Sequence, residues 1–509
     1  MTAALTVRTG TGRWVILACV LGSGLAGIDA TVVNIALPDI GRDLHVGFAT
    51  LQWTITSYTV TLAALILLGG ALGDRFGRRR IFVTGILWFA VASLLCAAAQ
   101  DATWLVVARA VQGVGGALLT PASLAIIQAS FADDDRTTAI GAWSGLSGAA
   151  SAIAPFVGGW LLQAGSWRWV FLINPPLAIL VAWIAARHIP ETRDPDQHGR
   201  IDVAGAALGV IGLGGVTAGL IASSDYGLAA TTVWLPLTLG VAGLGAFLAT
   251  EHRSRHPMMP LALFRSRQFS ATNAVTFLLY AANSGALLLL VIGLETVSGA
   301  SPLRAGTALL PITVVMLFLA ARFGALAQRI GPRLPMTVGP LVSAGGLALM
   351  SRLSTTSSYW LDILPAVTVF GLGLAVFVAP LTATVLGAVP ASHAGVASGV
   401  NNAVARAAGL IAVAALPVVV GLTGHAYESA SAYLTPFRHA IWICAGLHVG
   451  GAALAGLLIR DDAHTARRAA VPATSITLAG DPTLAGHANA PARRHRRHHE
   501  RRPLRSPGH

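Results

Sequence analysis

Residues 73–80, Gly-Asp-Arg-Phe-Gly-Arg-Arg-Arg, form a short turn between two long apolar segments. The whole chain of 509 residues is only 11% charged, so one acid and four arginines make this turn unusually dense in charge. An arginine at the centre of a bilayer costs several kcal/mol, which predicts that the turn lies at a membrane surface. The excess of arginine predicts that this surface is the cytoplasmic one.

The composition of the rest of the chain predicts a polytopic, all-α membrane protein. Hydrophobic residues make up 54% of the chain, and the apolar segments have the length of roughly 20 residues that spans hydrocarbon. The net charge of +13 comes from 34 basic residues, all arginine, which cluster in short loops and in the C-terminal tail. Because they do not form one basic face, we expect anionic membrane lipids rather than nucleic acid as their partners.

The cysteines do not predict a metal or redox site. Cys19, Cys96 and Cys444 all lie in apolar segments, without the spacing of metal ligands. No nucleophile–base pair or metal-ligand cluster is found within these segments. We therefore expect no enzyme activity and no cofactor, and we expect the protein to be a monomer.

Apolar length and polar breaks predict fourteen transmembrane helices. The first follows Arg8 and Arg13, as a signal peptide would, but it is too long for a signal-peptide core and is interpreted as a retained helix. Most arginines outside the spans fall in alternate loops, which predicts that both termini are cytoplasmic. The predicted spans are 14–36, 50–72, 81–99, 103–130, 138–163, 168–187, 202–222, 231–250, 270–293, 304–322, 335–352, 361–387, 395–420 and 438–459.

Two polar interruptions, at 188–201 and 251–269, divide the chain. They predict an N-terminal six-helix bundle at 1–190, a linker with two extra helices at 191–269, and a C-terminal six-helix bundle at 270–460. These bundles are called the N-terminal half and the C-terminal half below. Residues 461–509 are rich in Ala, Pro, Arg and His and are predicted to form a disordered basic cytoplasmic tail.

The turn at 73–80 has an internal echo. Residues 324–333, Gly-Ala-Leu-Ala-Gln-Arg-Ile-Gly-Pro-Arg, repeat the Gly-x-x-x-x-Arg-x-Gly-x-Arg frame of residues 70–79 without the acid, in the corresponding loop of the C-terminal half. Two related halves are typical of transporters that alternate access around a site near the bilayer midplane.

Several segments together resemble the major facilitator superfamily, and more narrowly its fourteen-helix drug–proton antiporters. The resemblance covers about residues 13–460 and departs from the family pattern at Ala154, where a glycine usually precedes the proline. It implies the major facilitator fold and a drug-exporting, proton-coupled activity in the cell membrane. The segments that carry it are 25–38, 70–80, 109–116 with Pro121, 141–159, 167–175, 301–306 and 395–402.

Asp29 is the one carboxylate that we place well inside a span of the N-terminal half. Burial favours the neutral form of a carboxyl group and a nearby cation favours its charged form. A carboxyl group between these two effects can bind a proton in one conformation and release it in another. Asp29 is therefore our candidate for proton coupling; the alternative is a static hydrogen-bonding partner of neighbouring helices.

Arg109 is the matching cation in the fourth span. A buried arginine needs a partner, and Arg109 either modulates the charge of Asp29 or serves it as a permanent structural partner. Gln112, one turn further along, extends such a network or fills a polar packing position. The sequence does not establish that Asp29 and Arg109 touch.

We interpret the turn at 73–80 as a conformational latch. Asp74 can favour a helix N-terminus or an arginine across the interface between the two halves, while Gly73 and Gly77 allow backbones to approach. Such a contact would stabilise the state that is closed to the cytoplasm. The latch residues are Gly73, Asp74, Arg75, Gly77, Arg78 and Arg79.

The fifth span contains the antiporter-type residues Gly148, Pro155, Gly158 and Gly159. Its glycines permit close approach of helices, and the proline removes a backbone hydrogen bond and can kink the helix. This span is either a bending element of the transport cycle or a site of tight static packing.

Four further polar residues are candidates for the substrate cavity or its mouth: Asn34, Glu295, Asn401 and Arg406. Glu295 lies near the outer end of its span. It is interpreted as a residue that attracts cationic substrates, as a second proton-binding site, or as a solvated residue at the mouth of the cavity. Because the spans are poor in acid apart from Asp29, we expect a neutral, zwitterionic or monocationic substrate rather than a dication.

The sequence thus predicts an exporter that exchanges incoming protons for a small amphiphilic drug, antibiotic or toxic metabolite. Without lysine no Gly-x-x-x-x-Gly-Lys-[Ser/Thr] phosphate loop is possible, so the energy must come from a gradient. Two alternatives remain: proton-coupled uptake of a small solute on the same fold, and a non-transporting membrane scaffold or receptor.

Overall fold

The computed structural model describes residues 5–163, 165–193, 202–227, 229–254, 257–389, 394–422, 427 and 429–461. Within these residues the chain is built from helices, with one isolated parallel bridge between Leu5 and Phe131. By its contacts the chain separates into Met1–His464 and Thr465–His509. The predicted tail lies outside the described residues from 462 onward.

The N-terminal half begins with α1, whose first turn is capped by Thr9 through a hydrogen bond from the Gly12 N–H. Asp101 caps α4 in the same way, accepting from the Trp104 N–H at 2.9 Å. Such caps satisfy the free N–H groups of a helix start. The helices are α1 (Gly10–Leu44), α2 (Phe48–Phe76), α3 (Arg78–Ala97), α4 (Ala102–Ser130), α5 (Asp133–Gln163), α6 (Trp169–Leu172) and α7 (Asn174–His188).

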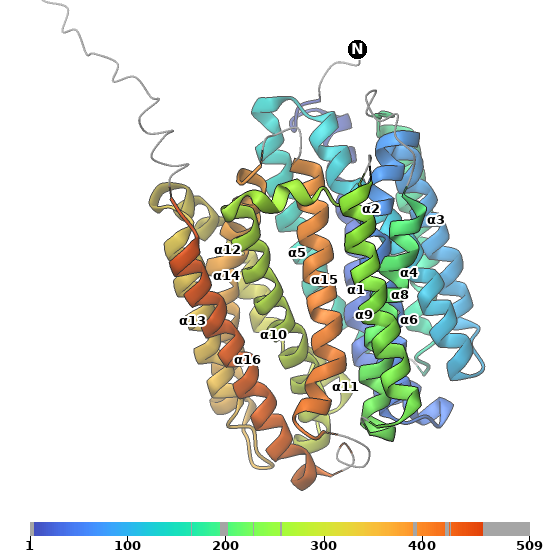
Figure 1. Ribbon diagram of the computed structural model, residues 1–509, viewed down its shortest axis with the longest axis vertical. Coiled ribbons are helices and arrows are strands. Elements are labelled where there is room, and N and C mark those ends of the chain that lie inside the picture. The colour runs from blue at the N-terminus through green and yellow to red at the C-terminus, as the bar shows by residue number, and fades with distance from the viewer. Residues whose placement is uncertain are drawn as a thin grey trace, which may run out of the picture. The chain divides into compact units, whose positions relative to one another are not determined.

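A helix pair follows, α8 (Val203–Tyr226) and α9 (Thr231–Arg253), and then a short turn of helix, η1 (Leu261–Arg265). The two helices cross closely where Gly215 meets Gly240, because neither residue has a side chain to hold the backbones apart. Besides α9, α8 packs against α2 and α15, and Figure 1 shows the pair beside α15. The inserted pair therefore lies where the two halves meet.

The C-terminal half contains the remaining helices, which Figure 1 shows in yellow-green to red. Its chain order is α10 (Arg267–Ser298), α11 (Pro302–Thr307), α12 (Leu310–Ile330), α13 (Arg333–Met350), η2 (Tyr359–Ile363), α14 (Leu364–Gly387), α15 (Ala394–Val419) and α16 (Ala430–Leu458).

Each predicted span overlaps a helix, but several differ from it in extent. The predicted span 304–322, for example, is divided between α11 and α12. The first helix continues through Pro38 to Leu44, because polar residues can extend a helix once it leaves the apolar region. The predicted span 168–187 is divided between α6 and α7 at Ile173. The predicted span 361–387 begins with the π-helical turn Tyr359–Ile363.

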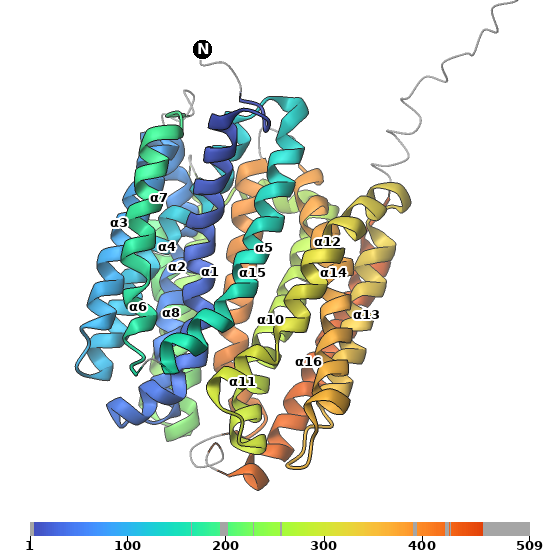
Figure 2. The ribbon, with the colours of Figure 1, turned by 180° about the vertical axis from the view of Figure 1, so that it is seen from behind.

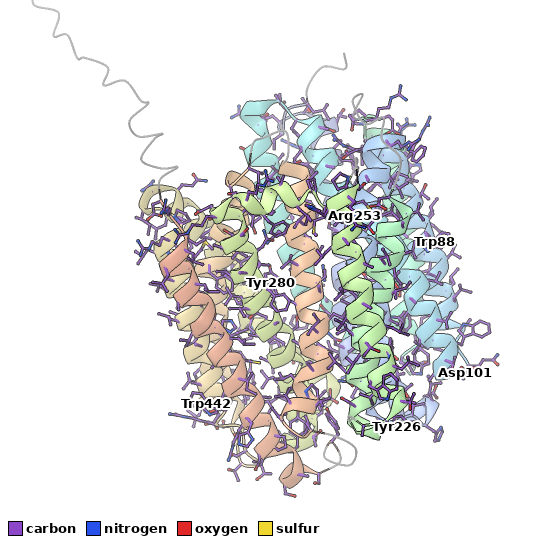
Figure 3. The ribbon with its side chains drawn as sticks, in the orientation of Figure 1. Trp88, Asp101, Tyr226, Arg253, Tyr280 and Trp442 are labelled. Carbon is purple, nitrogen blue, oxygen red and sulfur yellow. The ribbon has the colours of Figure 1, made fainter. Side chains whose placement is uncertain are left out.

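Membrane-spanning character is shown by twelve helical segments within the described residues, each long and apolar enough to cross a bilayer. The protein is therefore a multi-pass membrane protein. The count of fourteen spans and the side of the termini stay predictions. Trp88 and Trp442 are 46% and 56% exposed on outer helix faces, as Figure 3 shows, and such side chains suit contact with hydrocarbon.

Separate apolar cores hold the two halves together internally. Two core clusters draw their residues from positions 15–189, and the largest cluster draws its residues from positions 271–459. The halves meet along α2 and α15 on one face and along α5, α11 and α12 on the other, the face that Figure 2 shows. Far from the turn at 73–80, the Gln52 side chain donates from Nε2 to the Val413 carbonyl at 3.0 Å, which ties α2 to α15.

Candidate functional site

A buried ion pair lies at the centre of the N-terminal half. Arg109 on α4 donates from Nη1 to Asp29 Oδ2 on α1 at 2.5 Å. Both residues are only 1% exposed, so water does not screen the pair. Burying two charges is costly unless their geometry and remaining hydrogen bonds are good. The surrounding side chains meet this requirement.

Two amides donate to the other oxygen of Asp29. Gln112 Nε2 and Asn174 Nδ2 each donate to Oδ1 at 2.9 Å. Both amides also donate to Ser93 Oγ, at 2.9 and 3.2 Å. The carboxylate of Asp29 is therefore fully coordinated by α4 and α7, with Ser93 of α3 as a second partner of both amides.

Arg109 makes further contacts that fix its guanidinium. Its Nε donates to the Thr54 carbonyl at 3.0 Å, and its Nη1 also donates to Gln112 Oε1 at 2.6 Å. The guanidinium lies over the ring of Tyr58 at 4.4 Å and near that of Phe171 at 5.8 Å. Aromatic faces attract cations, more so when the cation is desolvated. The network thus draws on α1, α2, α3, α4, α6 and α7.

A cavity of about 680 Å³ lies between the two halves, next to this network. Arg109 lines it, whereas Asp29 does not, so Arg109 is the member of the ion pair that reaches the cavity. Apolar side chains from both halves make up much of the wall. They include Val33, Ile35, Ile55, Leu124, Leu287, Leu288, Val291, Ile292, Leu410 and Val413.

Three of the four predicted cavity residues line this space: Asn34 on α1, and Asn401 and Arg406 on α15. Asn401 Nδ2 also donates to Thr276 Oγ1 at 2.8 Å, which ties α15 to α10. Glu295, on α10, is not among the described lining residues. Its Oε1 is buried and has no hydrogen-bond partner among the described residues.

The charged turn at 73–80 is held within its own half. Asp74 accepts from Arg78 Nε at 2.8 Å, one helical turn away, and this contact lies within the N-terminal half. A contact of this turn across the interface between the two halves stays a prediction. The turn reverses at Gly77, whose φ of 111° suits glycine.

Glu191, three residues after α7, is the main partner of this turn. Its Oε1 accepts from the Arg79 N–H at 3.1 Å, and its Oε2 lies 3.6 Å from Arg79 Nε and 3.8 Å from Arg80 Nε. The carboxylate therefore caps the N-terminus of α3, where the helix dipole favours negative charge. A Cβ atom on Gly77 would lie only 2.5 Å from this carboxylate, so the glycine is needed for close approach.

The C-terminal half repeats this arrangement. Gly331 has a φ of 91°, and Asp461, three residues after α16, accepts from the Arg333 N–H at 3.1 Å at the start of α13. Arg333 Nε donates to the Gly456 carbonyl at 2.7 Å. The internal echo in the sequence thus corresponds to a repeated structural device, a carboxylate behind the last helix of each half that caps the helix after the turn.

On the fifth predicted span, α5 approaches α1 closely at Gly158. A Cβ atom on Gly158 would lie 2.8 Å from Val32 Cγ1, and Gly159 is also buried. The surroundings of Gly148 and of the Pro155 ring lie outside the described residues. The structure supports the tight packing that the glycines predict, while their role in bending stays a prediction.

Sequence reasoning missed four residues of these sites: Ser93, Asn174, Glu191 and Asp461. Asn174 carries the only usable signal, an amide directly before two prolines at a helix start. Among the described residues, no group of three or more His, Cys, Asp or Glu side chains is placed to hold a metal ion.

Comparison with known sequences gives one family and several related resistance proteins. Residues 19–414 match the family model of the Major Facilitator Superfamily. The chain is 32% identical to a methylenomycin A resistance protein of Bacillus subtilis over 87% of this chain and 96% of that protein. It is 37% identical to a puromycin resistance protein of Streptomyces alboniger over 80% of this chain and 82% of that protein.

Comparison with solved structures shows the same fold. A crystal structure of the peptide transporter POT in complex with sulfate superimposes with a TM-score of 0.62 over 90% of this chain and 98% of that chain. The two sequences are 16% identical, so this similarity concerns the fold alone.

Proposed function

Because the chain belongs to the major facilitator superfamily, we propose that it is a proton-coupled antiporter that exports small amphiphilic compounds across the plasma membrane by alternating access. Its substrates are drugs, antibiotics or a toxic metabolite. The related proteins named for resistance to methylenomycin A, puromycin and tetracenomycin C support this class of cargo.

The observation that carries the proposal is the buried Asp29–Arg109 pair beside a cavity between the two halves. Protonation of Asp29 would remove the charge that holds the Arg109 guanidinium and weaken the two amide hydrogen bonds to Oδ1. Since these contacts join α1, α4 and α7, a proton on Asp29 changes what holds the N-terminal half together beside the cavity. That change is the coupling step in this proposal.

The cavity suits the proposed cargo in size and chemistry. Its volume of about 680 Å³ lies within the range of roughly 300–1,000 Å³ that is usual for small-molecule pockets. The walls are largely apolar, with amides and hydroxyls at a few points. The energy would come from protons, each worth about 2.3 kcal/mol per 100 mV of membrane potential plus the pH term.

The proposed motion is a rocking of the N-terminal half, 1–190, against the C-terminal half, 270–460, with 191–269 as the connecting segment. In this proposal the latch stabilises the state that is closed to the cytoplasm and opens when the inner face opens. Its residues are Gly73, Asp74, Arg75, Gly77, Arg78 and Arg79. The span with Gly148, Pro155, Gly158 and Gly159 serves as a bending element during this motion.

Transport by the purified full chain in proteoliposomes tests the proposal. A chemically varied panel, including the compounds for which the relatives are named, is followed under an imposed pH gradient. We expect substrate to move opposite to protons and to accumulate against its own gradient. Movement with the protons would establish uptake instead, and a lack of flux for every compound would favour the scaffold reading.

A further inference from the structure

Arg406, in the middle of α15, presents a guanidinium to the cavity. The residue is half-buried, and among the described residues no side chain or carbonyl group is in hydrogen-bond or ion-pair contact with it. Tyr58 on α2 and Tyr280 on α10 line the same cavity, so Arg406 lies where the two halves face each other. Figure 3 labels Tyr280 on α10.

The two arginines of the cavity wall therefore differ in charge balance. Arg109 and Arg406 are the charged residues among the described lining residues. Arg109 is compensated by Asp29 at 2.5 Å, whereas Arg406 has no ion pair with a carboxylate in the part of the chain that the structure describes. A guanidinium is always protonated in proteins, and an uncompensated charge in an apolar cavity is costly. While the Asp29–Arg109 pair is intact, the charge of Arg406 therefore gives the lining of the cavity a net charge of one positive unit.

Two further polar atoms of the wall also lack partners. Asn34 Oδ1 and the Tyr58 hydroxyl are buried without a hydrogen-bond partner among the described residues, and both residues line the cavity. Unpaired buried polar groups are rare in folded proteins. A molecule that fills this cavity can supply a donor to Asn34 and either a donor or an acceptor to Tyr58.

We propose that the substrates of this transporter carry an acidic group, a carboxylate or an acidic hydroxyl, that binds to Arg406. The planar guanidinium matches a carboxylate with two parallel hydrogen bonds. The apolar body of the substrate fills the remaining cavity, and its hydroxyl or N–H groups reach Asn34 and Tyr58. This assignment rests on the proposed export function. It removes monocations from the substrates expected from the sequence, because Arg406 would repel them.

Binding to matched pairs of compounds tests the assignment. The full chain in lipid nanodiscs is dialysed against about ten aromatic carboxylates, such as 1-pyrenebutyrate, and the carboxamide of each, with empty nanodiscs subtracted. We expect the carboxylates to bind about tenfold more tightly than the amides. Arg406→Gln should bring this ratio close to one, and Arg406→Lys should keep part of it.

Arg253→Gln is the matched control, since Arg253 is exposed at the end of α9 and outside the cavity (Figure 3). It should leave the ratio unchanged. Equal binding of carboxylates and amides, no binding of any carboxylate, or an unchanged ratio in Arg406→Gln would overturn the assignment. If the protein binds carboxylates about tenfold more tightly than amides but shows no proton-driven flux, the proposed function is wrong and the assigned binding site stands.

Discussion

Arg109 and Asp29, 80 residues apart in sequence, form a hydrogen-bonded ion pair at 2.5 Å in which each side chain is at most 1% exposed. Either charge alone at that depth is costly, because the hydrogen bonds of a buried ion do not fully offset the cost of its desolvation. The pair is therefore a single chemical unit, and the effect of changing one member depends on the state of the other.

We expect Asp29→Asn to abolish accumulation of substrate against its gradient. An amide keeps the size of the carboxyl group but cannot take up or release a proton. Energetically downhill exchange should persist, because the cavity is lined by other residues. The measurement is proteoliposome flux with and without a pH gradient. Asp39→Asn, on the same helix but paired with the exposed Arg42, should behave as wild type; normal uphill transport by Asp29→Asn would refute the coupling role.

Arg109→Met should destabilise the protein by about 3–5 kcal/mol, since it leaves Asp29 buried without its cation. The double variant Asp29→Asn/Arg109→Met removes both charges and should recover much of this loss. Unfolding in a detergent titration gives the free energies for a double-mutant cycle. Strictly additive effects would show that the two residues are not energetically coupled.

Glu191→Gln should weaken the cap of α3 and lower stability by about 1 kcal/mol, because a charged acceptor for the Arg79 N–H is replaced by a neutral one. Asp461→Asn makes the equivalent change at α13 in the C-terminal half. We expect the two variants to show similar losses in a thermal unfolding assay. Asp74→Asn weakens the ion pair with Arg78 in the same turn and should lower stability less. A larger loss of stability in Asp74→Asn would indicate that Asp74 has a partner outside the turn.

Gly158→Ala should cost about 1–3 kcal/mol, because a methyl group enters the space held by Val32. Val32→Ala in the same chain makes room for it and should restore most of the stability. Gly141→Ala on the same helix meets no atom within 4 Å and serves as the control. If Gly158→Ala is as well tolerated as Gly141→Ala, the close packing of α5 on α1 is not important for stability.

Removal of the tail separates transport from a scaffold role. Deletion of residues 462–509 keeps Asp461 and its hydrogen bond to the Arg333 N–H, so we expect transport and unfolding temperature to change little. Deletion of residues 461–509 removes that cap as well and should lower the unfolding temperature further. Loss of all flux in the shorter deletion would favour a function that resides in the tail.

The sequence predicted the classes of the important residues better than their contacts. Asp29, Arg109 and Arg406 are charges inside apolar spans, and that position alone marks them as candidates. Asp29 proved to be paired with Arg109, while Arg406 lines the cavity without a partner among the described residues. The difference arises from how α1, α4 and α15 are rotated about their axes, which apolar composition does not encode.

The turn at 73–80 shows the same limit. Its density of charge and its echo at 324–333 are visible in the sequence, but its partner Glu191 lies 112 residues from Arg79. Nothing local distinguishes Glu191 from other acids after a helix. Only the packing of α7 against α3 brings it to the start of that helix.

By itself the sequence determined that the chain crosses a membrane many times, that the frame of the charged turn occurs twice, and which few ionisable groups lie within apolar segments. These are properties of residues along the chain, because transfer of a segment into hydrocarbon depends on its own composition and length. The tertiary structure decided which charges compensate one another and which remains open to the cavity, because pairing depends on the depth and rotation of helices that come from distant parts of the chain.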